Sequence, residues 1–463
     1  MSGLFQPIAA DRLFAWVFRE LESRDSVFGI PRRHFFLPRN DERYATTVFG
    51  QRIGTPFGPA AGPHTQMAQN IVAAWLCGAR YIELKTVQTL DELDVSKPCI
   101  DMQDEGYNVE WSQELKVHES LEEYARAWVL IHALHRKLGF AGESPDVVFN
   151  LSVGYNLEGI RQPNMQWFLD GAEDAGAHVE SLLERLESHY PDAHRLEVPR
   201  RLSDNVTLST MHGCPPEEIE SIAAYLMQER GLHTLVKCNP TLLGADRLRG
   251  ILYDDLGYHD VVVPDEAFAH DLRYDDAVPM LRNLQAVACG CGVEFGVKLS
   301  NTLEVENWRS HFEGDGMMYL SGRALHAVTV NLAAKLTEEF RGAIMLSYAG
   351  GADCFNVTDL LAAGMTTVTV CSDLLKTGGY LRLSQYVENL GAAIDSAGAI
   401  DLADLSARRA VGSDGFVEFV PLQAKSRQVH IERCIILQNT GDDVTLEVSF
   451  SVGSVEDALS AVF

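Results

Sequence analysis

Three segments of this chain have the composition of buried strands, and each has a lysine near the end of its apolar run. The segments are YIELKT, HTLVKCNPT and FGVKLSNT, with Lys85, Lys237 and Lys298, and two of them continue to an asparagine, Asn239 or Asn301. A cation at the end of an apolar strand is unfavourable unless an anion lies beside it. An isoalloxazine ring needs donors to its carbonyl oxygens and a cation where negative charge accumulates on reduction. The pattern therefore indicates a single anionic, redox-active ligand.

Eight strand-like runs alternate with helical patterns and would position these lysines. The expected strands are Pro56–Ala61, Tyr81–Lys85, Val147–Ser152, Val206–Ser209, His233–Lys237, Val293–Leu299, Ala343–Ser347 and Thr367–Cys371. This alternation predicts an α/β fold of the (β/α)8 TIM-barrel type, in which functional residues gather at the carboxyl ends of the strands. A doubly wound open sheet is the alternative, but the sequence has no GxGxxG between the first strand and its helix.

The predicted strand ends supply the remaining candidate residues. Backbone N–H groups of paired glycines after the seventh strand, with a small polar pair after the eighth, would cradle a phosphate. The small residues after the first strand would let a flat ring rest on the backbone. The candidates for flavin binding are Ala60, Ala61, Gly62, Lys85, Thr86, Asn150, Ser152, Lys237, Asn239, Lys298, Asn301, Thr302, Gly350, Gly351, Cys371 and Ser372.

Two side chains in the segment STMHGCPP could donate a proton to a substrate beside the flavin. Cys214 immediately precedes Pro215 and Pro216, which start a helical pattern, and the positive end of that helix would favour a thiolate. His212 is the second candidate, because imidazole titrates near neutral pH. The sequence therefore predicts catalytic roles for Cys214 and His212.

Composition limits the kind of protein and its partners. The net charge of −27 argues against a nucleic-acid or anionic-membrane surface, and no apolar run is long enough to span a membrane. The nine cysteines show no CxxC spacing, which suits reduced thiols. We expect a cytoplasmic protein, and a homo-oligomer is possible.

The chain divides into three expected regions. Residues 1–50 form an N-terminal helical lead-in with a short hairpin, residues 51–400 form the barrel, and residues 401–463 form a small β-hairpin tail. In the tail, two β-rich runs flank an Asn/Gly/Asp turn.

Residues from about 50 to 395 resemble a known superfamily, the FMN-binding barrels of dihydroorotate and dihydropyrimidine dehydrogenases. The resemblance is closest to the selenate reductase or glutamate-synthase-like flavoproteins. It rests on the segments TPFGPAAGPHT, IELKT, FNLSVGYNLEGI, STMHGCPPEEI, KLSNT and SGRALHAVTVNLAAKL, together with GAIMLSYAGGADCFNVTDLLAAGMTTVTVCSDLL. The resemblance implies FMN as the cofactor, Asn108 as a substrate-binding residue and Cys214 as the acid.

The resemblance also implies a reaction, an FMN-dependent reduction or oxidation of a C=C or C=N bond in a pyrimidine- or purine-like heterocycle. Because the sequence has neither cluster motifs nor a dinucleotide fingerprint, electrons are expected from an iron–sulfur or NAD(P)H-oxidising partner subunit. Two alternatives remain open. One is a non-catalytic flavin subunit that relays electrons, and the other is an aldolase-type barrel enzyme with a Schiff-base lysine.

Overall fold

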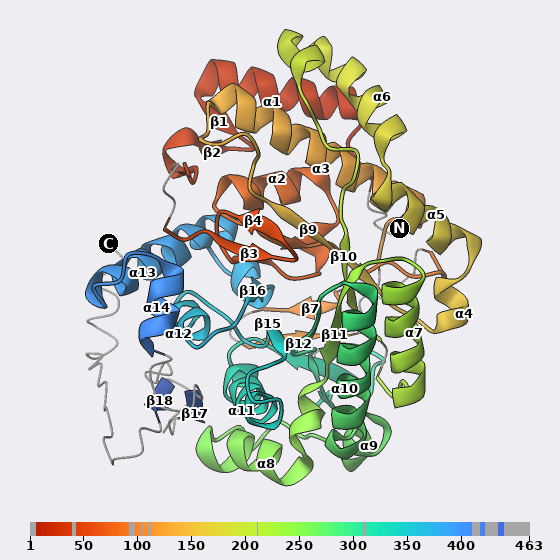
Figure 1. The fold of residues 1–463 in the computed structure, drawn as a ribbon, viewed down its shortest axis with the longest axis vertical. Helices are drawn as coiled ribbons and strands as arrows, with labels where there is room; N and C mark the ends of the chain where they lie inside the picture. The colour runs from red at the N-terminus through yellow and green to blue at the C-terminus, as the bar shows by residue number, and fades with distance from the viewer. Residues whose placement is uncertain are drawn as a thin grey trace.

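A parallel barrel of eight strands forms the centre of the molecule (Figure 1). The computed structural model describes residues 6–38, 43–91, 98–102, 105–109, 113–210, 212–308, 312–409, 417–421 and 434–438. The barrel strands are β5 (Phe57–Pro59), β6 (Tyr81–Glu83), β9 (Val148–Val153), β10 (Asn205–Leu208), β11 (His233–Cys238), β12 (Phe295–Leu299), β15 (Met345–Tyr348) and β16 (Thr367–Val370). They pair in the order β5-β16-β15-β12-β11-β10-β9-β6, and the Arg80 N–H donates to the Phe57 carbonyl at 3.0 Å where β5 meets β6. The predicted TIM barrel and all eight of its strands are confirmed.

Helices follow most strands and cover the outside of the barrel (Figure 1). They are α2 (Ala68–Leu76), α3 (Val117–Leu138), α4 (Leu157–Ile160), α5 (Pro163–Glu173), α6 (Gly176–Glu187), α7 (Pro216–Gln228), α8 (Ala245–Arg249), α9 (Asp265–His270), α10 (Tyr274–Cys291), α11 (Ala324–Glu339), α12 (Val357–Ala362), α13 (Leu383–Ser396) and α14 (Leu402–Arg409). Helix α3 ends before Gly139, which adopts φ 68° and forms a left-handed C-cap. Helix α14 extends the helical layer beyond residue 400, because Ser406 donates to the Leu361 carbonyl of α12 at 3.1 Å.

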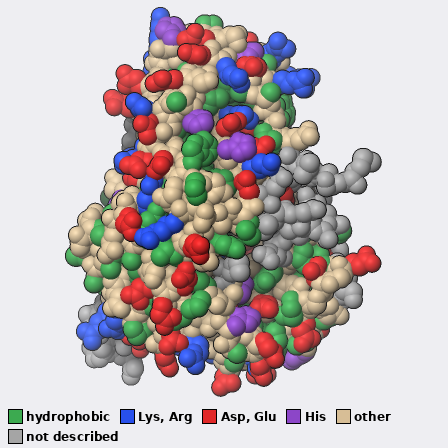
Figure 2. All heavy atoms as spheres, turned by 90° about the vertical axis from the view of Figure 1, so that its right-hand side faces the viewer, with side chains coloured by type: hydrophobic (Ala, Val, Ile, Leu, Met, Phe, Trp, Pro, Cys, Tyr) green, Lys and Arg blue, Asp and Glu red, His purple; other side chains and the backbone are tan. Residues whose placement is uncertain are grey.

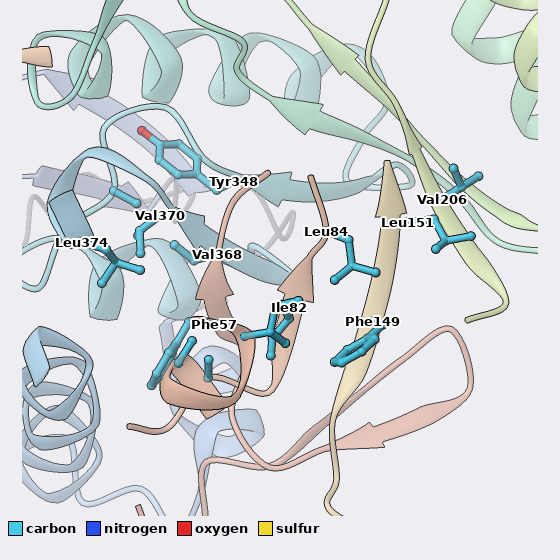
Figure 3. Close-up of a cluster of buried hydrophobic side chains, with 14 of the residues drawn as sticks. Phe57, Ile82, Leu84, Phe149, Leu151, Val206, Tyr348, Val368, Val370 and Leu374 are labelled. Atoms are coloured by element: carbon cyan, nitrogen blue, oxygen red, sulfur yellow. The ribbon is translucent and has the colours of Figure 1, made fainter. Parts of the chain in front are cut away.

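Side chains alternate between the two faces of each barrel strand. One set packs in the main hydrophobic core and includes Ile82 and Leu84 of the β6 segment and Phe149 and Leu151 of β9 (Figure 3). The intervening residues face the barrel interior, where polar side chains pair across the barrel. This alternation explains why strands that read as apolar also contribute lysines and asparagines to one internal site.

A hairpin packs against the barrel at the amino ends of its strands. Strands β3 (Thr46–Val48) and β4 (Gln51–Ile53) pair antiparallel, as the sequence predicts. Val48, Phe49 and Ile53 form a separate apolar cluster with Tyr81, Val148 and Leu235 of the barrel. The predicted N-terminal helix is also present, as α1 (Ala10–Arg24), and a two-residue ladder of β1 (Ser26–Val27) and β2 (Ile30–Pro31) follows it.

A second, antiparallel sheet follows the carboxyl ends of β6 and β12, and the sequence analysis did not predict it. Its strands are β7 (Ile100–Asp101), β8 (Gly106–Asn108), β13 (Leu303–Glu306) and β14 (Met317–Ser321), in the order β13-β14-β8-β7. The sheet carries Asn108, Tyr319 and Ser321 to the same cavity as the strand ends. We call it the cap sheet.

The tail contains one described ladder, β17 (Val417–Pro421) paired antiparallel with β18 (Cys434–Gln438). The sequence instead predicts a hairpin around the Asn/Gly/Asp turn after β18. The second run of that hairpin lies outside the described residues.

The surface is mixed in charge. On the face drawn in Figure 2, acidic side chains are spread widely and basic side chains are interspersed among them. Among the helices that the structure describes, none combines the length and apolar composition needed to cross a membrane.

Candidate active site

A cavity of about 400 Å³ lies at the carboxyl ends of the barrel strands, within the usual size range of small-molecule sites. The sequence-predicted residues that line it are Ala60, Ala61, Lys85, Thr86, Asn108, His212, Lys237, Asn301, Thr302, Gly350, Gly351, Cys371 and Ser372. These residues come from both halves of the barrel and from the cap sheet. The structure therefore brings together in one cavity thirteen of the nineteen residues that the sequence predicts for the site.

Lys85 and Lys237 are the two cations of the cavity wall. Lys85 is only 6% exposed, and burial lowers its pKa to about 8, with the Glu114 carboxylate opposing and Lys237 reinforcing the shift. The backbone at Lys85 is fixed, because its carbonyl accepts a hydrogen bond from the Tyr124 hydroxyl at 2.9 Å. An anionic ligand in the cavity would favour the charged form of Lys85.

Lys298 lies in the barrel interior and is not part of the cavity lining. It is fully buried, forms an ion pair with Glu83 of β6 and donates to the Thr369 hydroxyl of β16 at 2.7 Å. Burial opposes the charge on Glu83, but Lys298 and Lys237 hold the pKa of Glu83 below its ordinary value. Strands β6, β12 and β16 alternate around the barrel, as do the strands that fill one interior layer of such barrels. Lys298 therefore neutralises an internal carboxylate.

Four other predicted residues lie outside the cavity lining. Ser152 pairs with Thr86 through their hydroxyls at 2.7 Å, and Asn239 accepts a hydrogen bond from Asn301 at 3.1 Å. Asn150 lies in the barrel interior, where its amide donates to Asn205 at 2.7 Å. At Gly62, an added Cβ would lie 2.7 Å from His64 and 3.2 Å from the Cys371 sulfur.

Two glycines form a cradle beside the amino end of α11. A Cβ at Gly351, where φ is 75°, would lie 2.5 Å from the Gly322 carbonyl oxygen and 2.7 Å from the His326 nitrogen. A Cβ at Gly350 would lie 2.1 Å from the Thr329 hydroxyl oxygen. The Ser321 and Ser372 hydroxyls lie 3.0 Å apart on the same wall. Backbone N–H groups, hydroxyls and a helix amino end are the donors that a phosphate requires, so the residues present fit a phosphorylated ligand.

His212 faces the cavity from the loop after β10. Its Nδ1 lies 3.1 Å from Oδ1 of Asp271, and its ring stacks on Tyr319 with centroids 5.2 Å apart. Asp271 is buried and also accepts hydrogen bonds from the Thr241 hydroxyl at 2.6 Å and the Gly213 N–H at 3.3 Å. Asp271 thus holds the His212 ring in place.

Cys214 lies outside the cavity lining, half-buried at the start of α7 and packed against the main core. Burial raises the pKa of the Cys214 thiol to about 11, and the Glu218 carboxylate adds to the effect. Burial and the Glu218 carboxylate both disfavour a thiolate at Cys214, and so they oppose the effect expected from the helix amino end.

We expect Cys214 to be alkylated by iodoacetamide much more slowly than the exposed Cys289 at about pH 8, since the thiolate is the reactive species. Its rate should rise steeply as the pH approaches 11. Peptide mass spectrometry of the native protein would measure both rates. Rapid modification of Cys214 at neutral pH would restore it as a candidate acid.

Several residues of the site were missed in the sequence analysis. Gln88, Gln113, Tyr155, Tyr319, Ser321 and Gly322 line the cavity, and Asp271 supports it. The alternating pattern of MMYLSG before the α11 helix pattern could have indicated a strand that leads into the phosphate cradle. The segment HDLRY offers no comparable signal for Asp271.

The fold and the cavity together define a (β/α)8 barrel with a small-molecule cavity at the carboxyl ends of its strands. The family model "Oxidoreductase YgfK, N-terminal TIM-barrel domain" matches residues 28–413. The chain belongs to this family.

Similar proteins agree with this assignment. The protein named "Putative oxidoreductase YgfK" from Escherichia coli strain K12 is 43% identical over 409 residues, which are 84% of this chain and 39% of that protein. The protein of the same name from Escherichia coli O157:H7 matches with the same figures. The chain thus spans about two fifths of the length of these relatives.

Solved structures show the same fold at low sequence identity. Ligand-free DHODH from Eimeria tenella superposes with a TM-score of 0.55 at 15% identity, covering 86% of this chain and 97% of that one. DHODH from Eimeria tenella in complex with ferulenol gives a TM-score of 0.51 at 16% identity, covering 80% and 89%.

Proposed function

We propose that this barrel binds FMN and is the flavin-containing part of an oxidoreductase that acts on a small unsaturated heterocycle. The observation that carries the proposal is the placement of the Gly350–Gly351 cradle and the Lys85–Lys237 pair on the walls of one cavity. A phosphate and a ring that becomes anionic on reduction need these two groups of donors. Family membership and the DHODH-like fold support the same class of reaction.

The lining residues divide by chemistry into three groups. Gly350, Gly351 and Ser372 would hold the phosphate, and Lys85 and Lys237 would lie near the ring. When bound, FMN supplies hydride transfer. Asn301 and Thr302 would donate to carbonyl oxygens, while Ala60 and Ala61 leave a flat surface for the ring.

The substrate side of the cavity is formed by the cap sheet and by His212. Asn108, Tyr319 and His212 line this side, and each can donate or accept hydrogen bonds to a polar ring. Reduction of a C=C or C=N bond adds a hydride to one atom and a proton to its neighbour, so the site needs a proton donor. Of the two predicted donors, His212 is the one in the lining. We therefore assign the proton transfer to His212 in place of Cys214.

The electron donor is proposed to be an iron–sulfur or NAD(P)H-oxidising partner subunit or domain. The relatives are more than twice as long as this chain, which leaves room in such proteins for further redox domains. If the partner is required, dithionite should reduce the bound flavin readily and NADH or NADPH should reduce it slowly.

The purified protein should contain one FMN per chain, released on heat denaturation and quantified by chromatography. Replacing Lys85 by alanine should weaken FMN binding at least about tenfold, or about 1.4 kcal/mol, since a buried cation would be lost. Exposed Lys137 on α3, replaced in the same way, is the matched control. Failure to find FMN both after purification and after reconstitution would contradict the proposal.

One observation favours a second candidate, an enzyme that forms a Schiff base. Burial lowers the pKa of Lys85 to about 8, and a lysine that is partly neutral near physiological pH can attack a carbonyl. A flavin-free protein in which borohydride and pyruvate covalently modify Lys85, as detected by mass spectrometry, would support this candidate.

A further inference from the structure

Two histidines and a glutamate meet beside the substrate side of the cavity. They come from three separate elements: His212 from the loop after β10, His270 from the end of α9 and Glu304 from β13 of the cap sheet. One nitrogen or oxygen from each residue lies within 4.8 Å of those of the other two. Residues distant in sequence thus place three good metal-ligating groups around one point.

The surroundings of this trio suit a divalent cation. Nε2 of His270 lies 3.0 Å from Oε2 of Glu304 and 3.7 Å from Oδ1 of Asp271. With neutral imidazoles, Glu304 and Asp271 leave two negative charges in the cluster, and one divalent ion would balance them. The His212 and Glu304 side chains are each 15% exposed and that of His270 is 39% exposed, so an ion could reach the site from solvent.

The Asp271 carboxylate lies beside Nδ1 of His212, as carboxylates commonly lie beside the imidazole of a metal-binding histidine. Its oxygens lie 3.1 and 3.2 Å from the His212 Nδ1, and the Thr241 and Gly213 hydrogen bonds fix the carboxylate itself. Such a carboxylate orients the imidazole and fixes its tautomer. Asp271 would therefore be a positioning residue for the site.

We propose that His212, His270 and Glu304 bind a divalent transition metal, with zinc as the best match to two imidazoles and one carboxylate. Three protein ligands leave one coordination position for water or for a polar group of a substrate. Because His212 also lines the cavity, a metal ion bound by this trio would lie next to the cavity. A metal-bound water would then replace the His212 imidazole as the proton source. This consequence rests on the proposed function, but the proposal that the trio binds a metal does not.

Metal binding is tested by calorimetric titration of EDTA-treated, dialysed protein with zinc chloride. The protein should carry Cys289→Ser and Cys291→Ser, since both thiols are exposed and would bind zinc on their own. We expect one tight site per chain in this background. Cobalt chloride should give visible absorption bands of a low-symmetry site at the same stoichiometry.

Three variants separate the proposed site from surface binding. Glu304→Gln and His270→Ala should each remove the stoichiometric site, and Asp271→Asn should weaken it about 10- to 100-fold. Exposed His194, replaced by alanine, should have no effect. Circular dichroism identifies variants that fail to fold, and Glu304→Gln preserves the side-chain shape.

The outcomes are distinct. Absence of a stoichiometric site in the background protein, or an unchanged site in both Glu304→Gln and His270→Ala, would overturn the proposal and leave two histidine–carboxylate contacts. FMN content is measured on the same samples. If the protein binds FMN but no metal, the metal site is excluded and the proposed function stands. If it binds metal but no FMN, the proposed function is excluded and the metal site stands.

Discussion

Replacing Lys298 by methionine is expected to lower the free energy of unfolding by about 3–5 kcal/mol. The substitution would leave the buried Glu83 carboxylate without the partner with which it pairs across the barrel. A buried charge that loses its partner is destabilising because water cannot replace the lost interaction. Urea unfolding followed by circular dichroism would measure the change.

Two further variants establish the cause. The double variant Glu83→Gln/Lys298→Met should recover much of the lost stability, because it removes both charges. Arg282→Met breaks the solvent-exposed ion pair with Glu339 and should cost no more than about 1 kcal/mol. If Lys298→Met is as stable as wild type but lacks FMN, then Lys298 binds the cofactor, as the sequence first suggested.

Replacing Gly351 by alanine should weaken FMN binding by about a hundredfold or more, or about 2.7 kcal/mol. The new Cβ would lie 2.5 Å from the Gly322 carbonyl oxygen and 2.7 Å from the His326 nitrogen, so the cradle must shift. Backbone N–H groups bind a phosphate only when they converge on it, and a shifted loop loses this geometry. Fluorescence titration of the FMN-free protein would give both dissociation constants.

Gly364→Ala is the matched control for this prediction. Gly364 also has a positive φ, 94°, but an added Cβ would meet no atom within 4 Å. Both variants bear the strain of alanine in a left-handed conformation, and only Gly351→Ala has the close contact at the cradle. Equal FMN affinity in the two variants would show that Gly351 does not take part in phosphate binding.

The barrel was predictable because short, mostly apolar strand segments alternate with helical segments along the chain. The ends of the strands are also predictable, so the sequence groups Lys85, Lys237, Gly350 and Gly351 in one site, and all four line the cavity. The carboxyl ends of all strands in a parallel barrel lie at the same end of the barrel. The direction of the chain is therefore enough to identify the residues at that end.

The depth of each residue in the barrel was not predictable. Lys85 and Lys298 have similar sequence contexts, but the stagger of neighbouring strands puts Lys85 in the cavity wall and Lys298 opposite Glu83. Similarly, Cys214 and His212 are two positions apart, and only the path of the loop turns His212 into the cavity. Asp271 comes from a distant segment and meets His212 only through tertiary packing.

The β3–β4 hairpin at the amino ends of the strands bears on the order of substrate binding and product release. Val48, Phe49 and Ile53 pack against Tyr81, Val148 and Leu235 at the amino ends of the strands, whereas the cavity lies at the carboxyl ends. The cap sheet stands at that opposite end and carries part of the cavity wall. We therefore expect substrate and product to pass through the same opening at the carboxyl ends of the strands, so that a new substrate molecule binds only after the product has left.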